Sequence, residues 1–455
     1  MGEEAGTVSP FYPGTGNGGA PHRPPPGAAS ASPPSALRVS PWRAAQSMLG
    51  AMAARAAVHA GQCSRRGALR SRGARFMRPK LLPVLEPGAV PQRATWYTLV
   101  PLGESPSARV GHNCLYLPPA LTTGKGKVVI VGGADPNGSF SDAHIIDLDR
   151  HQWAMPGWVG LLPRYEHATF IPTSSPTSLW VFGGADQSGN RNCVQVLNLE
   201  TGIWESPKLI GTPPLPRTFH TSSAAIGDRL YVLGGGDKGA EPVKDPQLHV
   251  FDTATLTWSQ PEAHGNPPSP RHGHVVVAVG TKLFIHGGLS GDKFYNDLFC
   301  IDTNDMRWEK LPAAGDVPGG RAAHSAAAFG DHLYIFGGMD PTGALDTMYK
   351  YHIEKQQWTL LEFDSPLPPG RLDHSMCIIP WQVCVNVKNR DSDDVTSRNT
   401  IGKEATETVS DEDSDQKKQI GKGCTEDKLM YLFLIFGGMD TQGEIHRDCI
   451  VNLIK

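Results

Sequence analysis

Six short segments of the form Arg-x-x-His hold the side chains best suited to metal binding or acid–base chemistry. His272 lies two residues before His274, and with further ligands such a pair could take part in a copper or iron site. Glu166 and Asp373 could act as an acid–base pair if they met. They come from the second and the sixth segment, however, and need not approach one another. The six segments are Arg109/His112, Arg164/His167, Arg217/His220, Arg271/His274, Arg321/His324 and Arg371/His374.

The sixfold recurrence of these segments favours a structural role, since a catalytic centre would be expected at one place only. We therefore predict that the arginines and histidines hold loops and connect neighbouring units. The chain also has no phosphate-binding loop, no Gly-x-Ser-x-Gly nucleophile motif and no His-Glu-x-x-His zinc motif. The sequence accordingly predicts a protein that is not an enzyme and that uses no metal and no cofactor.

Two further markers accompany these segments and define a repeat of about 50 residues. An apolar run ends in a glycine pair, and a tryptophan follows about twenty residues later. The glycine pairs lie at 132–133, 183–184, 234–235, 287–288, 337–338 and 437–438. The tryptophans are Trp153, Trp204, Trp258, Trp308 and Trp358, and Trp96 precedes the first segment. This pattern resembles the Kelch repeat family, from Trp96 to the end of the chain.

Each repeat predicts one four-stranded sheet. Runs such as Leu333–Phe336 are rich in β-branched and aromatic residues, which is typical of strands buried on both faces. The recurring tryptophans are expected to fill the wedge between adjacent sheets. Since such a sheet cannot cover its own faces, its neighbours must supply the core. The fold class is therefore all-β, a six-bladed Kelch β-propeller.

The ends of the repeat region predict how the ring closes. The sixth unit has no tryptophan after its glycine pair before the chain ends at Lys455. The missing strand is present at the other end, where Ala94–Leu99 precedes the first unit. We expect this N-terminal strand to complete the last blade and close the propeller.

The regions outside the repeat differ in composition from the blades. Residues 1–80 are rich in Pro, Ala and Gly, carry a net charge of +9 and are predicted to be a disordered tail. Their Arg-rich part also resembles a mitochondrial transit peptide, an alternative that the Pro and Gly content disfavours. The propeller is expected over residues 81–455. Its sixth unit contains an acidic insert at about 385–428, predicted to be disordered and to lie between the first and second strands.

Charge and cysteine content exclude several functions. The total charge is −3, so the part beyond residue 80 is acidic and offers no electrostatic footprint for nucleic acid. The chain contains no apolar run of the roughly 20 residues that a transmembrane helix needs. Eight cysteines occur without a Cys-x-x-Cys pair, which indicates reduced thiols in the cytosol.

A partner would have to recognise the residues that differ from unit to unit. These lie between the recurring Arg and His and in the loops after the glycine pairs, which are expected on one face of the ring. Aromatic and arginine side chains around a concave mouth are frequent anchors of protein interfaces. The candidate partner-binding residues are Tyr165, Glu166, Arg191, Phe219, His272, Phe294, Tyr295 and Asp373.

Several stretches resemble one branch of the Kelch proteins more closely, the Rab GTPase effectors with Kelch motifs. They include LPVLEPG (82–88), LLPRYEHATFIP (161–172), PRTFHTSSAAIG (216–227) and PPGRLDHSMCIIPW (368–381). The resemblance runs from about Met77 to the end. It implies a cytosolic protein recruited to endosomal membranes by a GTP-bound late-endosomal Rab, in transport from late endosomes to the trans-Golgi network. Endosomal membrane-associated proteins are further possible partners.

Two alternatives remain open from the sequence. A Kelch substrate adaptor of a ubiquitin ligase would be expected to carry BTB and BACK domains, for which residues 1–93 are too short. A Kelch-fold small-molecule enzyme would need a constellation that breaks the repeat.

Overall fold

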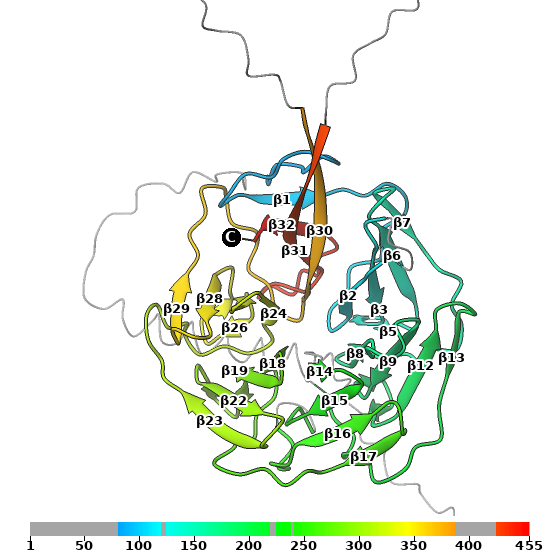
Figure 1. Cartoon of the computed structure of the whole chain (residues 1–455), viewed down its shortest axis with the longest axis vertical. Helices are drawn as coiled ribbons and strands as arrows, with labels where there is room; N and C mark the ends of the chain where they lie inside the picture. Colours follow the sequence, from blue (N-terminus) through cyan, green and yellow to red (C-terminus); the bar gives the residue numbers. More distant parts are fainter. Residues whose placement is uncertain (1–80, 120–123, 219–223, 238–240, 387–424, 455) are drawn as a thin grey trace, which may run out of the picture. The chain divides into compact units, whose positions relative to one another are not determined.

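The computed structural model describes residues 81–119, 124–218, 224–237, 241–386 and 425–454, all within the unit Val39–Lys455. These residues form strands, turns and loops, and six four-stranded antiparallel sheets are arranged around a centre (Figure 1). The prediction of an all-β, six-bladed β-propeller is therefore confirmed. No helix in the described ranges is long and apolar enough to cross a membrane. The predicted tail, residues 1–80, lies outside the described part.

The first three blades follow one another along the chain, and the strands of each run from the centre outwards. Blade one consists of β2 (Asn113–Leu117), β3 (Lys127–Val131), β6 (Ala143–Asp147) and β7 (Gln152–Ala154). Blade two consists of β8 (Ala168–Phe170), β9 (Ser178–Phe182), β12 (Val194–Asn198) and β13 (Ile203–Glu205). Blade three consists of β14 (Ala224–Ile226), β15 (Arg229–Val232), β16 (His249–Asp252) and β17 (Thr257–Ser259).

The other three blades complete the ring. Blade four consists of β18 (Val275–Val279), β19 (Lys282–His286), β22 (Leu298–Asp302) and β23 (Arg307–Leu311). Blade five consists of β24 (Ser325–Phe329), β25 (His332–Phe336), β28 (Met348–His352) and β29 (Gln357–Leu360). Blade six consists of β30 (Ser375–Asn386), β31 (Thr425–Phe436), β32 (Cys449–Leu453) and β1 (Trp96–Leu99).

Four short hairpins follow glycine pairs, between the second and third strands of blades one, two, four and five. They are β4 (Ala134–Asp135) with β5 (Gly138–Ser139), β10 (Ala185–Asp186) with β11 (Gly189–Asn190), β20 (Leu289–Ser290) with β21 (Lys293–Phe294), and β26 (Met339–Asp340) with β27 (Gly343–Ala344). These hairpins lie at the same end of their blades as the Arg-x-x-His segments, because each segment forms a backbone bridge with the residue after the glycine pair.

The second strand of each blade contains a run of buried residues, as the apolar runs predicted. In β25, Leu333 to Phe336 are all at most 3% exposed, so both faces of the strand are covered. The tryptophans on the outer strands lie between neighbouring blades. Trp358 of blade five, for example, packs with Phe284 and Cys300 of blade four. All six recurring tryptophans are buried: Trp96, Trp153, Trp204, Trp258, Trp308 and Trp358.

The N-terminal strand completes the last blade, as expected. β1 pairs antiparallel with β32 in a register that places Trp96 opposite Asn452 and Leu99 opposite Cys449. The Asn452 side-chain amide also donates a hydrogen bond of 2.8 Å to the Thr95 carbonyl. The strand that begins the propeller is thus hydrogen-bonded to the strand that ends it, and the ring closes through blade six.

The first two strands of blade six are longer than those of the other blades. β30 and β31 pair over all twelve of their residues, whereas β32 pairs only with Leu432–Phe436. The additional part extends past the rest of the blade (Figure 1). The predicted insert does lie between these two strands, but β30 runs into it to Asn386 and β31 begins at Thr425. Residues 387–424 lie outside the described part.

Closure through β1 predicts a large loss of stability when its central anchor is removed. Trp96 is fully buried, and its ring centroid lies 5.2 Å from that of Phe336 and 5.3 Å from that of Phe363. The substitution Trp96→Ala should lower the free energy of unfolding by about 3–5 kcal/mol, because it leaves a cavity between blades five and six. Denaturant unfolding followed by tryptophan fluorescence and circular dichroism measures this change.

Leu102→Ala is the matched control, since the Leu102 side chain follows the same strand and is 70% exposed. It should change the free energy of unfolding by less than about 0.5 kcal/mol. If the two variants unfolded at the same denaturant concentration, β1 would not be the strand that closes the ring.

Candidate protein-binding site

The recurring arginines are buried side chains that bind the glycine pair of their own blade. In every blade the Arg Nη1 donates to the carbonyl of the first glycine, over 2.9–3.1 Å. Each of the six guanidinium groups also reaches a side-chain acceptor on or shortly before the third strand, for example Asp142 for Arg109 and Asp448 for Arg371. A buried charge is tolerated only when its donors are satisfied, so these contacts hold the segment in place.

The glycine pairs also join each blade to the next. The amide of the second glycine donates to the carbonyl of the arginine in the following blade, over 2.8–3.2 Å. Gly133 donates in this way to Arg164, and Gly438 of the last blade donates to Arg109 of the first. The six hydrogen bonds therefore form a closed cycle around the ring.

The histidines of these segments that the structure describes are buried between blades. His112 Nε2 is 3.1 Å from the Phe436 carbonyl of blade six, and His274 Nε2 is 3.0 Å from the Leu233 carbonyl of blade three. Burial and the nearby Arg109 lower the pKa of His112 to about 3. Burial also lowers the pKa of His324 and His374. His112, His324 and His374 are therefore neutral at pH 7, which fits a structural role better than acid–base chemistry.

The residues directly before these histidines lie on a second, inner ring, and within the described part of the chain backbone hydrogen bonds join five of the six blades along it. Glu166 donates to Gly111, Gly111 to Asp373, Asp373 to Ala323, and Ala323 to Gly273. All five have positive φ values of 50° to 63°. Such values are uncommon for residues other than glycine, so the closed ring imposes this conformation on Glu166, Ala323 and Asp373.

Glu166 and Asp373 both lie on this inner ring, although their positions in the sequence did not require them to approach one another. Glu166 and Asp373 flank Gly111, because blade one lies between blades six and two in the closed ring. The Glu166 carboxylate accepts a hydrogen bond from the Thr218 hydroxyl. Burial raises the pKa of Asp373 to about 7. The pKa of Tyr165 is also raised, by burial and by the nearby carboxylates of Glu166 and Asp373. The centre of this face is thus a desolvated acidic site.

The predicted partner-binding residues divide into buried and accessible positions. Glu166 and His272 are 5% and 4% exposed and belong to the scaffold of the face. Tyr165, Arg191, Phe294, Tyr295 and Asp373 are half-buried, and Phe219 lies outside the described residues. The structure places the seven described positions at one end of the blades, in the Arg-x-x-His segments or the loops after the glycine pairs. Their role in binding stays a prediction.

The accessible candidates are held by defined contacts. Arg191 forms an ion pair with Asp186 of the β10 hairpin. The Tyr295 ring lies 3.9 Å from the Arg271 guanidinium carbon, in a cation–π contact. Phe294 packs against a small apolar cluster that comprises Val110, Met339, Leu372 and Met439. A surface of such restrained aromatic side chains loses little conformational entropy on binding.

Sequence reasoning missed two features of this face. One is the apolar cluster under Phe294, which brings together residues of blades one, four, five and six, and no local pattern marks it. The other is the carboxylate that pairs with the buried arginine in four blades: Asp142, Asp245, Asp297 and Asp448. Each lies nine or ten residues after the second glycine of a pair, and this spacing could have identified them.

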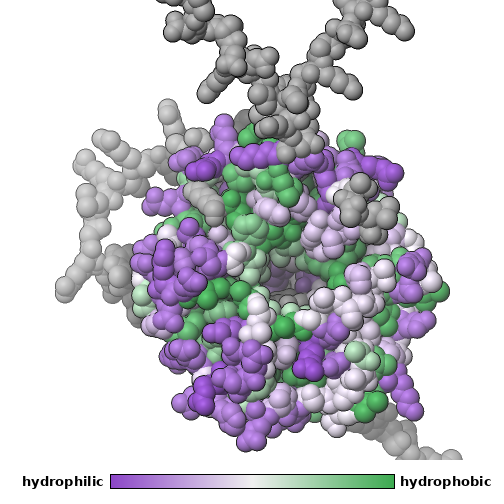
Figure 2. Space-filling view, in the orientation of Figure 1, coloured by the Kyte–Doolittle hydropathy of each residue, from purple (hydrophilic) through white to green (hydrophobic). Residues whose placement is uncertain are grey.

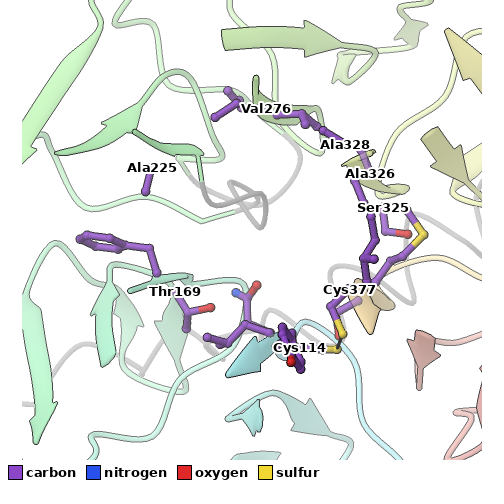
Figure 3. Close-up of a pocket in the computed structure, with 18 of the residues that line it drawn as sticks. Cys114, Thr169, Ala225, Val276, Ser325, Ala326, Ala328 and Cys377 are labelled. Carbon is purple, nitrogen blue, oxygen red and sulfur yellow. Dashed lines mark hydrogen bonds between the residues drawn. The ribbon is translucent and has the colours of Figure 1, made fainter. Parts of the chain in front are cut away.

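A cavity of about 460 Å³ lies among the inner strands. Its wall is formed largely by small and apolar side chains, with Thr169 and Ser325 among the polar ones (Figure 3). Hydrophobic residues and residues of intermediate hydropathy border the central hollow in Figure 2. The described residues include no group of three or more His, Cys, Asp or Glu arranged to hold a metal ion.

Comparison with known proteins agrees with this architecture. The family described as the KLHDC2/KLHL20/DRC7 Kelch-repeats domain matches residues 118–338 and 239–387. The fold, the buried arginines and the glycine pairs therefore define a Kelch-repeat β-propeller.

Curated relatives narrow the class further. The chain is 69% identical over 380 residues to the Rab9 effector protein with kelch motifs of Gallus gallus, 68% identical over 376 residues to that of Bos taurus and 63% identical over 375 residues to that of Homo sapiens. These matches cover 83%, 82% and 82% of this chain and the whole of each relative. The chain belongs to the family of Rab9 effector proteins with kelch motifs.

The raised pKa of Asp373 predicts a pH-dependent contribution to stability. The pKa is about 7 in the folded chain against an ordinary value of 3.8, so the folded state holds the additional proton between these values. Raising the pH through this window should therefore lower the free energy of unfolding. Asp373→Asn, which accepts the positive φ and cannot ionise, should become more stable relative to the unsubstituted chain as the pH rises from 5 to 8.

The measurement is the denaturant midpoint of both proteins at each pH. Glu354→Gln, which changes an exposed carboxylate, is the control and should follow the unsubstituted chain throughout. A difference between Asp373→Asn and the unsubstituted chain that stays constant with pH would contradict a raised pKa of Asp373 in the folded chain.

Proposed function

We propose that this protein acts as an effector that binds a GTP-bound Rab GTPase, and that it does not catalyse a reaction. The observation that carries the proposal is the match to relatives named as Rab9 effectors, which extends over the whole of their length. The partner suggested by these names is Rab9. The cellular process would be vesicle transport from late endosomes to the trans-Golgi network, with the protein in the cytoplasm and at the surface of endosomal membranes.

The geometry supports binding by the face that carries the Arg-x-x-His segments. The recurring Arg and His side chains are committed to the scaffold, so this face can vary only in the residues between and after them. Those positions supply Tyr165, Phe294 and Tyr295, three half-buried aromatic side chains, together with Arg191. Aromatic and arginine residues that are already ordered are the side chains most often found at the energetic centre of protein interfaces.

The acidic centre of the same face suits a partner with a basic contact residue. Asp373 with its raised pKa lies near Tyr165, and a cation placed over it would favour the ionised carboxylate. Binding through this point would then release a proton. We infer that affinity for the partner rises with pH between about 6 and 8.

Titration of the full chain with Rab9, loaded either with a GTP analogue or with GDP, tests the function. We expect binding of the GTP form only. Tyr165→Ala and Phe294→Ala should each weaken it by about tenfold or more, because each removes a large apolar contact at the interface. Isothermal titration calorimetry or biolayer interferometry gives the dissociation constants.

Tyr431→Ala is the matched control, since Tyr431 is an accessible tyrosine in the middle of β31, six residues before the glycine pair. It should leave the affinity unchanged. Weakening by Tyr431→Ala alone would move the interface to the extended strands of blade six. Equal binding of both nucleotide forms, or of neither, would contradict the effector function itself.

A further inference from the structure

Two cysteines face each other where the first and the last blade meet. Cys114 lies on β2, the innermost strand of blade one, and Cys377 lies on β30, the innermost strand of blade six. The Cys114 thiol donates to the Cys377 sulfur over 3.1 Å. Figure 3 shows the two side chains pointing toward one another at the wall of the central cavity. The sulfur atoms are separated by about 1 Å more than the length of a disulfide bond.

The central cavity gives a small reagent access to this pair. Both cysteines line the cavity, with 7% and 8% of their surface exposed. The cavity therefore brings a molecule of the size of hydrogen peroxide next to the residues of this pair, whereas a large thiol reagent cannot approach them as easily. Cys300, by contrast, is 5% exposed between blades four and five and does not line this cavity.

We propose that Cys114 and Cys377 form a redox-reactive site that a peroxide converts into a disulfide across the junction of blades one and six. In the first step one thiolate attacks the peroxide, the O–O bond breaks, and a sulfenic acid and water form after proton transfer. In the second step the other sulfur attacks the sulfenic sulfur, the S–S bond forms and a second water leaves. Two thiols are oxidised and one hydrogen peroxide is reduced to two waters.

The surroundings of the pair determine its rate. The hydrogen bond with Cys114 and burial keep the pKa of the Cys377 thiol well above its usual range. Since the thiolate is the nucleophile, oxidation at neutral pH is slow and accelerates as the pH rises. The pair is therefore suited to sustained oxidation rather than to rapid peroxide sensing, and its reduction would need a dithiol that can enter the cavity.

A third thiol could compete for the same bond. Cys449 on β32 is 4% exposed, lies in the same core cluster and interacts electrostatically with Cys114. It is not among the residues that line the cavity. The accessible pair is therefore Cys114 with Cys377, and Cys449 provides an internal comparison.

The disulfide would join residues that are 263 positions apart in the chain. Its loop contains most of blade one and all of blades two to five, so it would fix the ring at the junction already closed by β1. We expect a raised melting temperature after oxidation, since a crosslink over a long loop restricts the unfolded chain. Dithiothreitol should reverse the increase.

Peptide mapping of the full chain after peroxide treatment tests the proposal directly. The protein is oxidised while folded, alkylated under denaturing conditions and digested with trypsin. The expected product links the peptide 110–125, which contains Cys114, to the peptide 372–388, which contains Cys377 and Cys384. Fragmentation of the linked product must place the bond on Cys377. Its yield should increase with pH.

Three variants separate this site from other reactions. Cys114→Ser and Cys377→Ser should each abolish the linked peptide and the rise in melting temperature, whereas Cys300→Ser should retain both. Linkage of the peptide 110–125 to 448–455 instead would assign the reaction to Cys449 and overturn the proposal. Sulfinic acid on Cys114 or Cys377 without any linked peptide would overturn it as well, and that outcome is visible in the unsubstituted protein.

Discussion

The structure depends on one repeated contact, the hydrogen bonds that a buried arginine makes with the glycine pair of its blade. The guanidinium charge is removed from water, so it must be satisfied by the glycine carbonyl and by polar groups of the third strand. The second glycine then donates to the arginine carbonyl of the next blade. No side chain fits at the first glycine: in blade one a Cβ on Gly132 would come 2.7 Å from the Arg164 carbonyl oxygen. The arginines and the glycine pairs therefore recur together in the sequence because each buried guanidinium group needs the glycine pair of its blade as a hydrogen-bond partner.

This constraint also explains where recognition can evolve. A residue that holds two blades together cannot change without loss of the ring, and the buried arginines and histidines are all of this kind. The residues between them are fixed in backbone conformation by the inner hydrogen-bonded ring, but their side chains differ from blade to blade. The backbone of these segments is therefore the same in the blades that this ring joins, and only the side chains that it carries differ. A partner that contacts Tyr165 or Phe294 meets residues whose positions are set before binding.

The sequence predicted the features that depend on local pattern and on counting. Six glycine pairs and six tryptophan strands were enough to predict the number of blades, and the unmatched Trp96 strand predicted closure. Three features that it did not predict depend on the ring being closed. Glu166 and Asp373 are 207 positions apart, and they approach only because blade one lies between blades two and six. The pairing of Cys114 with Cys377 and the apolar cluster under Phe294 arise in the same way.

The junction of blades one and six differs from the other junctions in the sequence separation of the residues that meet there. At the other junctions the joined residues are one repeat apart, whereas at this one His112 meets Phe436, Gly111 meets Asp373 and Gly438 meets Arg109. The entropy lost in closing a loop grows with its length, so these contacts are the least favoured until the rest of the ring has formed. The β1 strand adds four residue pairs to blade six next to this junction. A closed ring benefits from such reinforcement, because opening at one junction would expose the apolar faces of two blades at once.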